Sequence, residues 1–78
     1  MKVTELQNIL QSWKVSDQLY SIMIGGLPNE KLCLVQLSEK EWEVYYSERG
    51  KKTGIKVFSS EDEACEYFLQ KMARYRQD

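Results

Sequence analysis

Residues 42–59, WEVYYSERGKKTGIKVFS, contain two runs of strand-forming residues on either side of a polar stretch with a glycine. Aromatic and β-branched residues separated by a short turn are typical of a β-hairpin. We expect strands over residues 42–48 and 53–59. The turn between them is Arg49-Gly50-Lys51-Lys52, where Gly50 supplies a positive φ angle. The pattern predicts two antiparallel strands.

Two further strands are expected before this hairpin. Residues 19–24, LYSIMI, are rich in strand formers and are followed by two glycines. Residues 31–37 form another apolar run after a turn that has proline at its second position. The polar residues 38–41, SEKE, then lead into the hairpin. Consecutive strands with short polar connections predict an antiparallel meander of three to four strands.

A helix is expected at each end of the chain. Apolar residues recur at spacings of three and four in residues 3–13, and Thr4 with Gln7 fits a capping box, so the first helix should cover residues 4–14. The stretch Ser60-Glu61-Asp62-Glu63 fits a second capping box with acids in the first turn, which predicts a helix over residues 61–75.

These elements define one α+β domain, residues 1–78. A chain of 78 residues is too short to build two separate cores. The C-terminal helix carries an apolar stripe that includes Phe68 and Met72, so it is expected to pack on one sheet face.

The register of the strands decides which residues this helix covers. If Leu37 lies opposite Trp42 and Glu48 opposite Thr53, the strands present one uncharged face and one mixed face. The expected core face contains Cys33, Val35, Leu37, Trp42, Val44, Tyr46, Ile55 and Val57. The mixed face contains Leu32, Leu34, Gln36, Glu43, Tyr45, Ser47, Lys56 and Phe58. We expect the mixed face to be covered by the first helix or to bind a partner.

Charge and hydropathy limit the possible functions. The chain has 12 acidic and 11 basic residues and a formal net charge of −1. No overall positive field would attract nucleic acid, so nucleic-acid binding is not favoured. No run of about 20 apolar residues could span a membrane. A cytoplasmic protein with no membrane partner is the default interpretation.

The residues offer little for catalysis. The sequence has no histidine, and its two cysteines, Cys33 and Cys65, lie in apolar patterns where a thiol is usually buried. No nucleophile–base pair or metal-ligand set is present, so no enzyme activity, metal or cofactor is predicted. The Gly50–Gly54 spacing also differs from a phosphate-binding loop, and a strand follows it rather than a helix.

Residues 42–72 resemble small immunity proteins of bacterial polymorphic, contact-dependent-type toxin systems. The resemblance lies in the order WEVYYSERG followed by FSSEDEACEYF. It implies a cytoplasmic protein that binds and inhibits a cognate toxin domain stoichiometrically. The alternative is a small nucleic-acid-binding or regulatory module that uses the basic hairpin of residues 49–56. A homodimer is also possible through an uncovered sheet face.

The mixed face supplies the expected partner-binding site. Its apolar and aromatic members serve as anchors, and charges of both signs surround them, as in specific protein interfaces. The predicted site residues are Leu32, Leu34, Glu43, Tyr45, Glu48, Arg49, Lys56 and Phe58.

Overall fold

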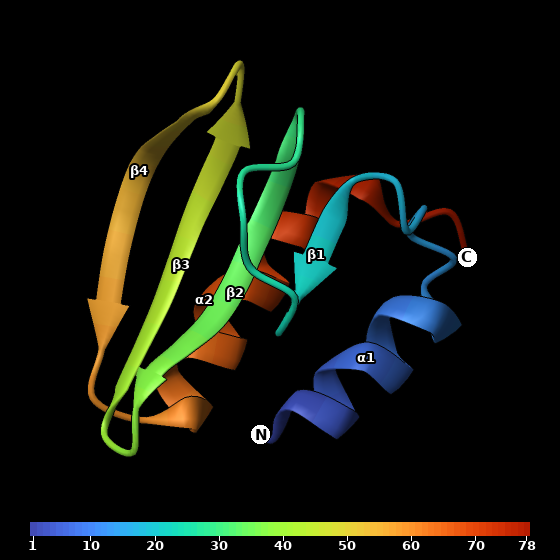
Figure 1. Ribbon diagram of the computed structural model, residues 1–78. Coiled ribbons are helices and arrows are strands. Elements are labelled where there is room, and N and C mark those ends of the chain that lie inside the picture. The colour runs from blue at the N-terminus through green and yellow to red at the C-terminus, as the bar shows by residue number, and fades with distance from the viewer.

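The computed structural model describes residues 1–78 and confirms the α+β class (Figure 1). It contains two α-helices, four strands and a final 3₁₀ turn. In chain order these are α1 (Val3–Ser12), β1 (Tyr20–Ile22), β2 (Lys31–Ser38), β3 (Glu41–Glu48), β4 (Lys51–Phe58), α2 (Glu61–Met72) and η1 (Ala73–Tyr75).

The four strands form one sheet in the order β1-β2-β3-β4. The antiparallel meander is confirmed for β2, β3 and β4, whereas β1 runs parallel to β2. A parallel neighbour requires the chain to cross back over the sheet. The connection of residues 23–30 is long enough for this, because β1 has only three residues and extended chain spans up to about 3.5 Å per residue. Gly25 and Gly26, both with positive φ, lie in this connection.

The helix α2 packs on one face of the sheet, α1 packs against α2 on the β1 side of the molecule, and residues 23–30 pass over the other face (Figure 1). One buried cluster joins α1, α2 and the sheet. Its members are Leu6, Leu10, Val15, Ile22, Leu34, Trp42, Val44, Ala64, Cys65, Phe68 and Met72. The first helix therefore does not cover the second sheet face.

The predicted register between β2 and β3 is wrong. Trp42 lies opposite Gln36 rather than Leu37, and Ser38 lies opposite Glu41. The pairing shifts between Gln36 and Ser38, which makes Leu37 the extra residue of a bulge. A shift of one residue exchanges the two faces of a strand, so β2 directs Leu32 and Leu34 toward the helices.

The register between β3 and β4 also differs from the prediction. The turn has only two residues, Arg49 and Gly50, with φ angles of 51° and 74°, as a type I′ turn requires. The pairing then shifts opposite Tyr45, next to Gly54, whose φ is also positive. This bulge turns Ile55 and Val57 away from the helices.

The two bulges exchange the sides of the sheet on which the residues of β2 and of the second half of β4 lie. The helix-covered face contains Leu32, Leu34, Gln36, Trp42, Val44, Tyr46, Lys56 and Phe58. The opposite face, here called the open face, contains Cys33, Val35, Glu43, Tyr45, Ser47, Ile55 and Val57. The predicted core face is therefore correct for β3 and wrong for β2 and the second half of β4.

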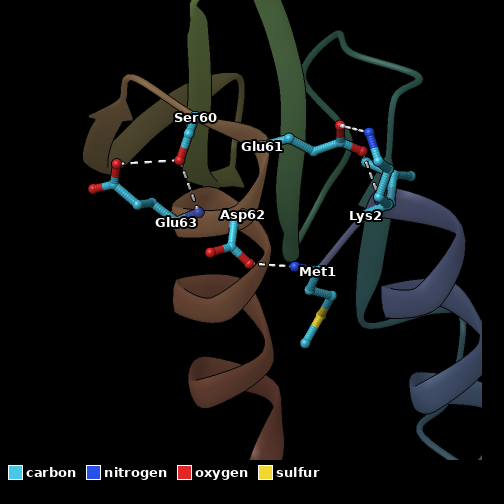
Figure 2. A network of polar contacts seen from close by, with 7 residues as sticks. Met1, Lys2, Ser60, Glu61, Asp62 and Glu63 are labelled. Carbon is cyan, nitrogen blue, oxygen red and sulfur yellow. Dashed lines mark hydrogen bonds and ion pairs between the residues drawn. The ribbon is translucent and has the colours of Figure 1, made fainter.

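The two helices begin with different caps. Ser60 caps α2 as predicted, since its Oγ accepts a hydrogen bond from the Glu63 N–H at 3.2 Å (Figure 2). The predicted Thr4 cap is wrong because α1 begins after Lys2, which provides no side-chain cap. The Val3 N–H instead donates to Glu61 Oε2 at 2.8 Å. A carboxylate of α2 thus caps α1.

The C-terminal end of α1 contacts residues that follow η1. The Gln77 N–H donates to the Trp13 carbonyl at 2.8 Å. The Arg76 guanidinium lies 4.3 Å from the centre of the Trp13 ring, within the range of a cation–π contact. Both ends of α1 therefore contact residues from the last quarter of the sequence.

Candidate functional site

The open face is the largest part of the sheet that no helix covers (Figure 1). A row of side chains crosses it, with Val35 on β2, Glu43 on β3 and Val57 on β4 directly opposite one another. Ile55 precedes Val57 on the same side, and both are about half exposed, at 50% and 53%. Leu37, in the β2 bulge, is 53% exposed. Ile55 and Val57 form a short apolar strip at the β4 side of the face.

An ion pair lies within this apolar surface. Lys52 Nζ is 3.1 Å from Glu43 Oε1, and the Glu43 side chain is only 11% exposed. The same ammonium group lies 4.3 Å from the centre of the Tyr45 ring. Because the carboxylate is largely removed from water, the lysine that neutralises it is fixed in position rather than free in solvent.

The crossing segment of residues 23–30 covers the other half of the open face. The Tyr45 hydroxyl donates to the Gly26 carbonyl at 2.7 Å, and the Arg49 N–H donates to Asn29 Oδ1 at 3.2 Å. Burial raises the pKa of Tyr45 to about 12, so the hydroxyl remains protonated and able to donate at neutral pH. The segment itself exposes Ile24 and Leu27 to solvent.

The predicted site residues do not form one surface. Leu34 is fully buried beneath the helices, and Leu32 and Phe58 lie on the same covered side. Phe58 packs against Tyr67, with 5.2 Å between the ring centres. Tyr45 is on the open face but buried under the crossing segment.

The charged members of the predicted site are also separated. Glu43 is buried in its ion pair on the open face, whereas Lys56 lies on the opposite side with Val44 as its neighbour. Glu48 and Arg49 lie at the tip of the hairpin. Only Glu43 and Tyr45 of the eight predicted residues belong to the open face, and both are buried.

Sequence reasoning missed the exposed residues Ile55 and Val57, which it assigned to the core. The signal that could have identified them is Gly54. An isolated glycine in a strand is typical of a bulge, and a bulge reverses the sides of the residues that follow. Lys52 was likewise expected to lie in a solvated loop, but it is in β4 and pairs with Glu43.

The basic residues of the hairpin do not form a continuous surface. Lys51 lies opposite Glu48, and Lys52 is paired with Glu43. Lys56 is on the other side of the sheet from Lys52. Positive charges that are divided between two faces and lie next to acids give no stripe along which a phosphate backbone could run.

Both cysteines are free and fully buried. Burial raises the pKa of the Cys33 thiol above its usual range and raises that of Cys65 to about 11. At pH 8 a thiol with that pKa is ionised in only about one molecule in a thousand, and the thiolate is the reactive form. The buried-core interpretation of the two thiols is confirmed.

We expect the folded protein to resist alkylation. Iodoacetamide at pH 8 should modify neither cysteine in the native state, because both thiols are buried and protonated. In denaturant both should be modified at the rate of a free thiol. Mass spectrometry of a time course measures the difference, and rapid modification of Cys33 or Cys65 without denaturant would contradict the buried placement.

No helix has the length and apolar character needed to cross a membrane. Comparison of the chain with protein-family models, curated proteins and solved structures gives no match.

Proposed function

We propose that the chain is a binding protein that docks on a toxin domain through its open face and thereby neutralises it. The observation that supports this most is the strip of half-exposed Ile55 and Val57 on a sheet face that no helix covers. Apolar side chains gathered on an accessible surface mark protein-interaction sites. The sequence resemblance to bacterial immunity proteins supplies the class of partner.

The dimensions of the sheet are sufficient for a specific interface. The Cα atoms extend over 33 × 29 × 17 Å, so the molecule is a thin plate whose broad side is the sheet. A standard interface buries about 800 Å² on each partner. The two longer extents of the molecule, 33 and 29 Å, are large enough for a contact of this size.

The Glu43–Lys52 pair gives this surface a polar feature at a fixed position. An ion pair within an apolar patch adds little affinity by itself, but it disfavours partners that cannot match its charges. Lys52 is more exposed than Glu43, at 38% against 11%, so a partner would meet the ammonium group first. We expect a carboxylate of the toxin domain to lie near Lys52.

The test is binding of the chain to a candidate toxin domain, chosen from the genes that neighbour its own. Val57→Asp and Ile55→Asp should each weaken binding by more than about 2 kcal/mol, because each would bury an unpaired charge in the interface. The same variants should lose protection when they are co-expressed with the toxin domain.

Thr53→Asp is the matched control. It places the same charge in the same strand, but Thr53 lies on the helix-covered side opposite Tyr46 and is exposed. It should bind as the unchanged protein does. Circular dichroism must show that all three variants are folded. If Val57→Asp and Ile55→Asp are folded and bind as the unchanged protein does, the open face is not the binding site.

A further inference from the structure

A groove of about 360 Å³ lies on the helix-covered side of the sheet, between the end of α2 and the strands. Its apolar lining comes from Leu19, Leu32 and Met72. Three tyrosines from three different elements complete it: Tyr46 of β3, Tyr67 of α2 and Tyr75 of η1. Gly54 also lines the groove, and a Cβ atom there would meet nothing within 4 Å.

Two cations lie on the helical wall of the groove without an acidic partner. Lys71 and Arg74 line it, and neither takes part in any of the four ion pairs of the chain. Lys71 Nζ is 5.3 Å from the centre of the Tyr67 ring, and Arg74 Cζ is 5.9 Å from that of Tyr75. The positive charges therefore lie beside the aromatic rings and remain able to pair with an anion.

The groove also offers a hydrogen-bond acceptor. Glu30 comes from the segment that enters β2, and it too forms no ion pair. Tyr46 lies close to it: burial raises the pKa of the Tyr46 hydroxyl, and the charges of Glu48 and Glu30 raise it further. The groove is thus lined by two cations from α2 and η1, by a carboxylate from the segment that enters β2 and by three aromatic rings.

We propose that this groove binds a small molecule that has a planar ring, an anionic group and a hydrogen-bond donor. The ring would lie among the tyrosines, as aromatic rings prefer stacked or edge contacts. The anion would pair with Lys71 and Arg74, and the donor would bind Glu30. A volume of about 360 Å³ is at the lower end of the range for small-molecule sites. Aromatic acids and nucleotides both carry these three features.

Titration of isotope-labelled protein, followed by NMR, tests the proposal with two probes, 4-hydroxyphenylacetate and adenosine monophosphate. We expect saturable shifts at the amides of Tyr46, Gly54, Lys71 and Tyr75, with a Kd of about 1 mM or below for at least one probe. Tighter binding of 4-hydroxyphenylacetate would indicate a carboxylic acid as the ligand, and tighter binding of adenosine monophosphate would indicate a nucleotide. The neutral analogue 4-hydroxyphenylacetamide should bind at least about fivefold more weakly than its acid.

Variants assign the binding to the groove. Lys71→Gln and Arg74→Gln should each raise the Kd about threefold to fivefold, because each removes one partner of the anion. Lys40→Gln is the control, since it removes the same charge from the exposed turn after β2 and should leave the Kd unchanged. Absence of shifts with both probes, at concentrations up to about 10 mM, would overturn the proposal. Equal weakening of binding by Lys71→Gln, Arg74→Gln and Lys40→Gln would overturn it too.

This inference does not depend on the proposed toxin-binding function. The groove and the open face lie on opposite sides of the sheet. Val57→Asp, which should abolish partner binding, is expected to leave binding of both probes unchanged. The two proposals can therefore succeed or fail separately.

Discussion

Phe68→Ala is expected to lower the free energy of unfolding by about 3–5 kcal/mol, a large part of the stability of a small domain. Phe68 is fully buried and belongs to the cluster that joins both helices to the sheet. Its ring meets that of Tyr20 edge to face, with 6.3 Å between the centres. Truncation would leave a cavity between α2, α1 and β1. Urea unfolding monitored by circular dichroism measures the change.

Phe58→Ala provides the comparison for this prediction. The same atoms are removed, but Phe58 is only partly buried at the end of the edge strand β4. Less area returns to water and the site can relax, so the loss should be clearly smaller. Equal losses in the two variants would contradict the central position of Phe68.

Trp42→Ala should also cost about 3–5 kcal/mol, because Trp42 is 6% exposed and lies in the same buried cluster. Its cross-strand neighbours are Gln36 and Phe58. The predicted and observed registers both bury this ring, so the variant alone does not distinguish them.

Leu37→Ala distinguishes the two registers. In the predicted register Leu37 is a core residue opposite Trp42, and its truncation would cost about 2–5 kcal/mol. In the structure Leu37 is half exposed in a bulge, so the expected change is within about 0.5 kcal/mol. A large loss of stability in the Leu37 variant would show that the bulge is absent.

The secondary structure could be predicted from the sequence because its signals are local. The acids after Ser60 and the apolar stripe to Met72 define α2, and the predicted end at residue 75 agrees with the end of η1. Gly50 marks the hairpin turn, and its φ is positive as expected. Strands β2, β3 and β4 lie within two residues of their predicted bounds.

The faces of the sheet could not be obtained in the same way. The side of the sheet on which a residue lies depends on two bulges, one at Leu37 in β2 and one next to Gly54 in β4. One extra residue reverses the side of every residue beyond it. The predicted anchors Leu32, Leu34 and Phe58 were misplaced for this reason. Tyr45 was placed on the correct strand but not under the crossing segment, because that contact joins positions 19 residues apart in the sequence.

The capping of α1 from a distance has a consequence for the order of folding. A ten-residue helix is too short to be stable alone, and the groups at its two ends bind Glu61 and Gln77. During synthesis α1 emerges well before Glu61 and Gln77. The first helix therefore acquires its full set of contacts only after residue 77 has been made, so its docking belongs to a late step of folding.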